Sequence, residues 1–92
     1  MTRTTVHITI FGRVQGVSFR AVMKEKALHH LVDGWVRNTV DGSVEALLQG
    51  EEEDVRRMIE WSRLGPPRAS VTRVVEERRK EHPRQAGFRI AD

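Results

Sequence analysis

Alternating apolar and polar residues open the chain. Between residues 4 and 12, apolar side chains occupy every second position, at Val6, Ile8 and Ile10, with polar residues between them. A period of two predicts a strand with one buried face. The alternation stops at Gly12, so we expect residues 12–18 to form a loop.

From Phe19 onward the spacing of apolar residues changes to that of a helix. Phe19, Met23, Ala27 and Leu31 recur four residues apart, which predicts an amphipathic helix over residues 19–31 with these four side chains on its inner face. His30 lies on the same stripe, and we expect it to be a half-buried, hydrogen-bonded histidine.

A β-hairpin is predicted next. Residues 35–38 are predicted to form a short strand, Asp41-Gly42 is a strong hairpin turn signal, and residues 43–49 return as the partner strand before Gly50. Because Trp35 is a large aromatic residue in this hairpin, we expect it, like Trp61 further on, at the core or its edge.

The second half of the chain predicts one helix and two strands. Residues 51–54 are all acidic, which suits the first turn of a helix because its macrodipole favours negative charge. The Gly65-Pro66-Pro67 stretch ends that helix. Strands are expected over residues 71–76, extending as far as Arg79, and over 87–90, with a turn at His82-Pro83. The predicted inner face of the helix comprises Val55, Met58, Ile59 and Ser62.

This order of elements is β-α-β-β-α-β with an additional C-terminal strand. It predicts an α+β fold, a ferredoxin-like βαββαβ sandwich whose antiparallel sheet of four to five strands is covered on one face by two helices. Ninety-two residues are enough for one core, so we expect a single domain, residues 1–92.

Composition narrows the functional classes. The chain has no cysteine, which excludes disulfides and thiolate metal sites. Its net charge of +3 is spread evenly along the sequence, whereas nucleic-acid-binding proteins concentrate basic residues on one side. We also find no signal peptide and no apolar run long enough to span a membrane. The expected location is therefore cytoplasmic, with neither nucleic acid nor membrane as a partner.

Candidate chemistry begins in the loop after the first strand. Gly12 and Gly16 allow backbone N–H groups to converge on an anion, and Arg20 follows at the start of the helix. The stretch has neither the Lys-Ser/Thr of a nucleotide P-loop nor the dinucleotide glycine spacing, so a phosphate-sized ligand is indicated. Taken alone, however, a plain turn with a solvated arginine is the more common meaning of such a loop.

Two further polar residues have an ordinary structural interpretation beside a functional one. Asn38 ends the strand before the hairpin turn, where asparagine is usually a turn residue. Ser18 precedes the helix, and we expect it to cap the helix rather than to contact a ligand. His7, His29 and His82 have no spacing typical of a metal site, and we expect them at the surface.

Taken together, the motifs resemble the acylphosphatase family. The residues that carry the resemblance are Gly12-x-Val14-Gln15-Gly16-Val17-x-Phe19-Arg20, followed by Gly34-Trp35-Val36-x-Asn38 and Asp41-Gly42-x-Val44. Gly50, Trp61, Gly65-Pro66-Pro67 and Gly87-Phe88 extend the resemblance over nearly the whole chain. This sequence departs from the family at Ala21 and Val22, where many relatives carry aromatic residues, and at His30-Leu31, where a Leu-Gly pair is usual.

The resemblance implies a hydrolase that cleaves the carboxyl–phosphate bond of acyl phosphates without metal or other cofactor. Arg20 would clamp the phosphate and Asn38 would hold the attacking water. Inorganic phosphate would be a product inhibitor, and we expect a monomer. The implied substrate-binding residues are those of the loop and the first helical residue: Gly12, Arg13, Val14, Gln15, Gly16, Val17, Ser18 and Phe19.

Two alternatives remain at this point. The first is a binding module on the same fold for a phosphorylated metabolite or for RNA, although three Phe and no Tyr provide few side chains on which bases stack. The second is carbamoyl phosphate hydrolysis, since related domains occur inside larger hydrogenase-maturation proteins. Because this sequence shows no flanking domain, we expect the hydrolysis of acyl phosphates described above and not that of carbamoyl phosphate.

Overall fold

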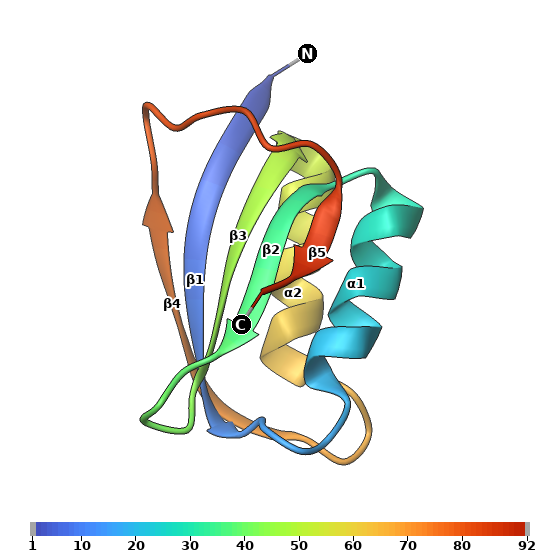
Figure 1. Ribbon diagram of the computed structural model, residues 1–92, viewed down its shortest axis with the longest axis vertical. Coiled ribbons are helices and arrows are strands. Elements are labelled where there is room, and N and C mark those ends of the chain that lie inside the picture. Colours follow the sequence, from blue (N-terminus) through green and yellow to red (C-terminus); the bar gives the residue numbers. More distant parts are fainter. Residues whose placement is uncertain (1, 92) are drawn as a thin grey trace.

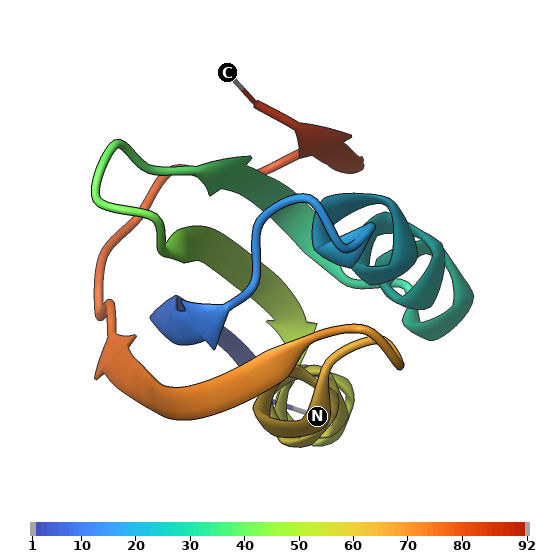
Figure 2. The ribbon, with the colours of Figure 1, turned by 90° about the horizontal axis from the view of Figure 1, so that it is seen from below.

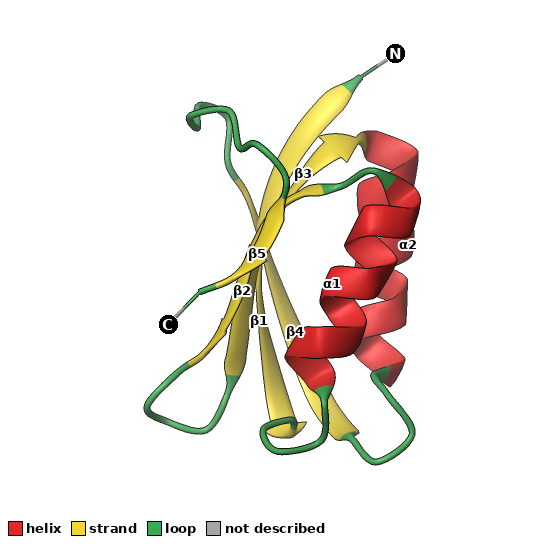
Figure 3. Ribbon diagram, turned by 45° about the vertical axis from the view of Figure 1, so that its right-hand side comes forward, coloured by secondary structure: helices red, strands yellow, loops and turns green. Residues whose placement is uncertain are grey.

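The computed structural model describes residues 2–91, so the predicted domain 1–92 includes two residues, Met1 and Asp92, outside the described part. The chain forms one sheet with two helices packed on the same face (Figures 1 and 3). This layered α+β arrangement confirms the predicted fold class. The elements are β1 (Arg3–Arg13), α1 (Phe19–His30), β2 (Asp33–Asn38), β3 (Val44–Glu51), α2 (Glu52–Leu64), β4 (Ser70–Arg78) and β5 (Phe88–Ile90).

The five strands lie in the order β4-β1-β3-β2-β5. Each neighbouring pair is antiparallel except β2 and β5, which are parallel. The prediction of an antiparallel sheet was therefore wrong for the last strand. The reason lies in the connection over residues 79–87, which carries the chain from one edge of the sheet to the other at a single end (Figure 1). Since β5 returns from that end, it runs opposite to β4 and parallel to β2.

The connection between β4 and β5 passes over the sheet face that the helices leave open (Figure 3). Gln49 fastens it there: its side chain donates to the carbonyl of Pro83 at 3.3 Å and accepts a hydrogen bond from the Gln85 N–H at 2.6 Å. Gly34 and Gly87 are joined by a backbone hydrogen bond of 2.8 Å. These contacts lie outside β5 and hold it in place even though the strand itself is short.

The hydrophobic core lies between the helices and the sheet. Each large aliphatic or aromatic side chain that is fully buried in this core stabilises the fold by about 1.5–3 kcal/mol. Phe19, at the start of α1, is 2% exposed and packs against Trp61 of α2 at 5.2 Å between ring centroids. The helix residues that face the core are Phe19, Met23 and Ala27 of α1, and Val55, Met58, Ile59 and Ser62 of α2.

Leu31 is a difference from the prediction. It was expected on the buried stripe of α1 but is 82% exposed. The helix ends at His30, and Leu31 takes a left-handed conformation with φ 58°. Its side chain therefore leaves the helical stripe, and the next residue, Val32, is buried instead.

Candidate active site

The strand register brings the two predicted motifs to the same level of the sheet. β1 and β2 both pair with β3, and Ile10 of β1 and Asn38 of β2 both lie opposite Val44. Because β1 and β2 flank β3 and run in the same direction, their C-terminal ends lie at one edge of the molecule. The view from below looks onto this edge, where the loop after β1 leads into α1 (Figure 2).

The loop that follows β1 has an unusual backbone. Gly16 and Ser18 both have positive φ, 74° and 65°, which is the left-handed region that non-glycine residues rarely adopt. Space around Gly16 is open, with no heavy atom within 4 Å of where a Cβ would be. Backbone conformation, and not lack of space, therefore favours glycine at this position.

Gly12 lies in β1 and not in the loop, where it was predicted. β1 continues through Arg13, so Gly12 lies in the strand at an irregularity of its pairing with β4. A Cβ on Gly12 would lie 2.1 Å from the carbonyl oxygen of Ser70. Glycine is needed there for the close approach of two strands, and the loop is shorter than predicted, residues 14–18.

A cleft of about 200 Å³ opens between the loop, the start of α1 and the ends of β2 and β5. It brings together Arg20 and Asn38, which lie eighteen positions apart in the sequence. The residues lining the cleft are Val14, Gly16, Ser18, Phe19, Arg20, Ala21, Asn38 and Ile90.

Asn38, one of the residues that line this cleft, has an unsatisfied polar atom. Within residues 2–91, its Oδ1 is buried from solvent and has no hydrogen-bond partner. A buried carbonyl oxygen without a partner is destabilising by about 1–3 kcal/mol, and most proteins avoid it. Such an atom is suited to accept a hydrogen bond from a bound molecule.

Arg20 is the charged group of the cleft. Its side chain is half-buried, and in the described part of the chain it forms no ion pair with a carboxylate. The guanidinium is therefore available to a ligand, and its planar fork matches two oxygens of a phosphate.

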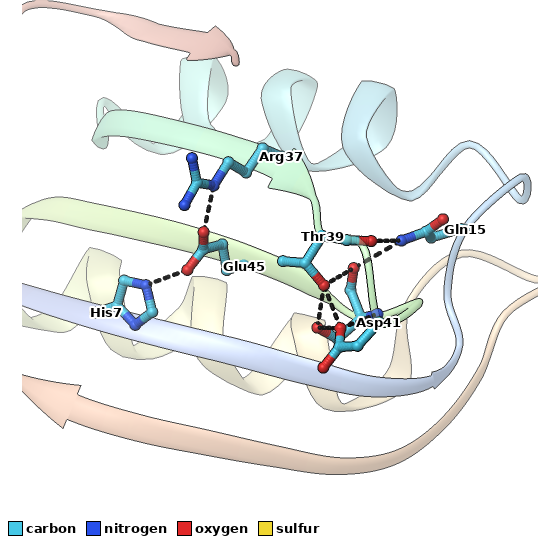
Figure 4. A network of polar contacts seen from close by, with 7 residues as sticks. His7, Gln15, Arg37, Thr39, Asp41 and Glu45 are labelled. Atoms are coloured by element: carbon cyan, nitrogen blue, oxygen red, sulfur yellow. Dashed lines mark hydrogen bonds and ion pairs between the residues drawn. The ribbon is translucent and has the colours of Figure 1, made fainter. Parts of the chain in front are cut away.

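Gln15 links the loop to the hairpin that carries Asn38. Its side-chain amide donates to the backbone carbonyls of Thr39 at 2.8 Å and Ser43 at 2.9 Å (Figure 4). One side chain therefore fixes the distance between the loop and the end of β2. Because the Gln15 side chain points toward the hairpin, only the backbone of Gln15 is left to face the inside of the loop.

Asp41 orders the hairpin turn from within. Its carboxylate accepts hydrogen bonds from the Thr39 hydroxyl, from the Ser43 hydroxyl at 2.7 Å and from the Ser43 N–H at 3.0 Å. These bonds, the Thr39 hydroxyl first, lower the pKa of Asp41 to about 2. The turn next to Asn38 is therefore held by an ionised carboxylate.

A second polar cluster lies on the open face of the sheet behind Asn38. Glu45 of β3 pairs with Arg37 of β2 and with His7 of β1, the latter at 2.9 Å (Figure 4). Burial pushes the pKa of Glu45 upward, but the Arg37 and His7 hydrogen bonds and charges outweigh it, so the net shift is downward. His7 is thus half-buried and paired, contrary to the surface position predicted for it.

Comparison with known proteins identifies the family. The family model for acylphosphatases matches residues 6–90. An acylphosphatase of Thermococcus kodakarensis is 47% identical over 90 residues, with 98% of both chains covered. One of Thiobacillus denitrificans is 54% identical over 70 residues, 76% of this chain and 79% of that one. The crystal structure of a Bacillus subtilis acylphosphatase superposes with a TM-score of 0.93 at 31% identity, covering 97% of this chain and 99% of that one.

The chain belongs to the acylphosphatase family. It is accordingly a hydrolase that acts on acid anhydrides. The family motifs identified in the sequence are the segments that the fold brings together at the cleft.

The acylphosphatase motif divides into residues that line the cleft and residues that support it. Of those predicted to contact substrate, Val14, Gly16, Ser18 and Phe19 line the cleft together with Arg20 and Asn38. Gly12, Arg13, Gln15 and Val17 do not. Ser18 does not cap α1, as was predicted: it adopts the left-handed conformation and its side chain makes no capping hydrogen bond.

Two residues that line the cleft, Ala21 and Ile90, were not predicted from the sequence. The position of Ala21 was available as a signal, because it directly follows Arg20 on the first turn of the helix. No signal in the sequence indicated Ile90. Its position depends on the parallel pairing of β5 with β2, which follows from the path of the connection between β4 and β5.

A larger cleft, of about 260 Å³, lies between α2 and the outer strand β4. Its charged groups pair with one another: Arg63 with Glu76, and Arg78 with Glu52 at 3.9 Å. Paired charges are less available to a ligand than Arg20. The motif residues that line a cleft, among them Arg20 and Asn38, lie in the other one.

Residues 2–91 contain neither a metal-binding cluster nor a membrane-spanning helix. Among residues 2–91 no group of three or more His, Asp or Glu side chains is arranged to hold a metal ion. Neither of the two helices in that range is long and apolar enough to cross a membrane.

Proposed function

We propose that this protein hydrolyses acyl phosphates at the cleft formed by residues 14–20 and Asn38. In this reaction water adds to the phosphorus, the bond between phosphorus and the carboxyl oxygen breaks, and a carboxylate and inorganic phosphate leave. The observation that carries the proposal is that Asn38, whose Oδ1 has no hydrogen-bond partner, lines the same cleft as Arg20, which forms no ion pair within residues 2–91.

The phosphoryl group is held by the loop and by Arg20. Gly16 and Ser18, with their left-handed backbones, bend the loop so that successive N–H groups can face one anion. The start of α1 adds positive potential to this concavity. Arg20 supplies a full positive charge, and its two outer nitrogens bind two of the phosphoryl oxygens. Charge that develops on these oxygens in the transition state is stabilised by donors already in place.

Asn38 positions the attacking water. Its Oδ1 accepts a hydrogen bond from the water, which directs an oxygen lone pair toward the phosphorus. An amide does not remove a proton at neutral pH, so the proton passes to a phosphoryl oxygen of the substrate. This role makes use of an atom that otherwise lowers the stability of the fold.

The reaction needs no general acid because a carboxylate is a weak base and leaves without protonation. Positioning and electrostatic stabilisation are then the main requirements of phosphoryl transfer, and backbone amides with one arginine meet them. We therefore propose that no metal ion takes part.

A phosphate-release assay tests this function. We expect turnover of acetyl phosphate at an unchanged rate in excess chelator, with inorganic phosphate as a competitive inhibitor. In ¹⁸O-labelled water, the label should appear in phosphate and not in acetate. Phosphate binding without turnover would show a binding module instead. A rate that falls with chelator and returns with a divalent cation would contradict the metal-free mechanism.

A further inference from the structure

Part of the cleft lining is apolar and has no side-chain group that could bind phosphate. Two of these lining residues are Ala21 on α1 and Ile90 on β5. Ile90 is 40% exposed, which is unusual for a large aliphatic residue. We call these two residues the apolar shelf.

The sheet register directs Ile90 toward the reacting groups. Ile90 pairs with Val36 of β2, and residues paired between strands point to the same face. Val36 is fully buried beneath the helices, so Ile90 lies on the helix side. Asn38 is two residues beyond Val36 and therefore shares this face. A hydrogen bond of 2.8 Å from the Ala91 N–H to the Val36 carbonyl fixes the pairing.

The shelf and the phosphate grip lie on different parts of the same cleft. The grip consists of Gly16, Ser18 and Arg20, and the lining contains no acidic residue. An acyl phosphate has a charged phosphoryl end and an acyl end that varies between substrates. With its phosphoryl end at Arg20, the acyl end has the remaining, apolar lining as its neighbour.

We propose that Ala21 and Ile90 bind the acyl portion of the substrate and make the enzyme selective for uncharged aliphatic and aryl acyl phosphates over those whose acyl group ends in a carboxylate. This inference rests on the proposed function. Its physical basis is burial of apolar surface, which contributes up to about fourfold in affinity for each methylene fully removed from water. Because the shelf is open on one side, about twofold per methylene is expected.

The experiment compares kcat/KM for acetyl, butyryl and hexanoyl phosphate, each divided by its uncatalysed hydrolysis rate. We expect an increase on the order of tenfold from acetyl to hexanoyl phosphate. Succinyl phosphate has the same four acyl carbons as butyryl phosphate, with a carboxylate in place of the terminal methyl group. It should be several-fold poorer than butyryl phosphate.

Variants of Ile90 assign the preference to the shelf. Ile90→Thr keeps a β-branched side chain but makes it polar, and should reduce the hexanoyl-to-acetyl ratio about threefold or more. Ile90→Phe enlarges the apolar surface and should raise the ratio, a gain that misfolding does not produce. Val75→Thr is the matched control: Val75 is 45% exposed on β4, away from the cleft, and its ratio should equal that of the parent.

The outcomes separate this inference from the proposed function. If none of these substrates is hydrolysed, the proposed function itself fails. If all are hydrolysed with the same normalised kcat/KM, or if succinyl phosphate is preferred, the reaction stands and the shelf is wrong. A ratio that changes equally in Val75→Thr and Ile90→Thr also overturns the assignment to Ile90.

Discussion

Within residues 2–91, two non-glycine residues have left-handed backbones, Ser18 and Leu31, and their surroundings differ. Ser18 lies in the cleft, where an uncommon conformation shapes a binding loop. Leu31 is 82% exposed and only ends α1, at a position where glycine is the usual residue. We propose that the strained backbone of Ser18 serves substrate binding, whereas strain at Leu31 is a stability cost alone.

Leu31→Gly is therefore expected to stabilise the protein. Relief of the left-handed strain contributes about 1–2 kcal/mol, and the greater freedom of glycine in the unfolded chain removes about 0.5–1 kcal/mol. The net gain of about 0.5–1 kcal/mol corresponds to a rise in Tm of about 2–8 °C, measured by calorimetry. Leu31→Ala is the control, since alanine retains the strain. Equal Tm values for the two variants would show that Leu31 is unstrained.

At the residue scale, the sequence predicted the location of residues whose type has few roles in proteins. It did not predict the role of a residue when that role depends on its backbone conformation. Arg20 and Asn38 were predicted to meet, and they do line one cleft. Ser18 was predicted to cap α1, but capping requires an extended backbone at that position, and Ser18 is left-handed. Nothing in the one-dimensional pattern distinguishes these two conformations.

At the scale of elements, Gln15 connects the loop after β1 to the β2–β3 hairpin through two hydrogen bonds. Gln15→Met keeps the length of the side chain and removes both donors. We expect a loss of about 1–2 kcal/mol in unfolding free energy, and a lower kcat because Asn38 is no longer held at a fixed distance from the loop.

Gln85→Met is the matched control for this change. Within residues 2–91, the side-chain amide of Gln85 makes a single, exposed hydrogen bond, to the carbonyl of Pro83 on the far face of the sheet. Urea unfolding and acetyl phosphate kinetics of the two variants give the comparison. An unchanged kcat in Gln15→Met would mean that the hairpin holds Asn38 without help from the loop.

The hairpin turn should also respond to acid through Asp41. Its folded pKa of about 2 lies below the ordinary value of 3.8, so the unfolded chain binds more protons between these values. The stabilisation is therefore complete above about pH 4 and is lost as the pH falls through about 2. Asp41→Asn keeps a good turn former while removing the charge.

The measurement for Asp41 is Tm as a function of pH. The parent should have a higher Tm than Asp41→Asn at pH 7, and the two values should converge toward pH 2. A difference in Tm that is the same at pH 7 and pH 2 would contradict the role of the ionised carboxylate.

Elements were predicted well where periodicity was strong and less well where long-range pairing decides. The residues of both helices and of the hairpin followed their apolar spacing. β1 extends through Gly12 and Arg13 because pairing with β4 holds a segment that appeared to be a loop. The parallel direction of β5 was not predicted, since three residues contain no information on the strand beside which they lie.

At the scale of the whole molecule, strand order converts distant sequence motifs into one site. The motifs at residues 12–20 and 34–38 meet because β1 and β2 both flank β3 (Figure 2). The family resemblance in the sequence was confirmed, and with it the ferredoxin-like arrangement. The surroundings of the acyl group could not be predicted, because they depend on where the C-terminal strand returns.

We propose that the chain acts as a single cooperative domain. The last strand joins the same sheet as the first, and both helices pack on one shared core. Heat unfolding followed by far-UV and near-UV circular dichroism should therefore give coincident transitions. Separate transitions for the two signals would indicate that part of the chain, such as β5, unfolds independently.

The account depends most on the meeting of Arg20 and Asn38 at one phosphoryl group, and their alanine variants test it most directly. Arg20→Ala and Asn38→Ala should each lower kcat/KM for acetyl phosphate by about 10²-fold or more, as lost electrostatic and positioning contributions do. Arg57→Ala, at an exposed position of α2, is the control for loss of a positive charge and should match the parent. Retention of near-parental kcat/KM in either site variant would contradict the assigned site.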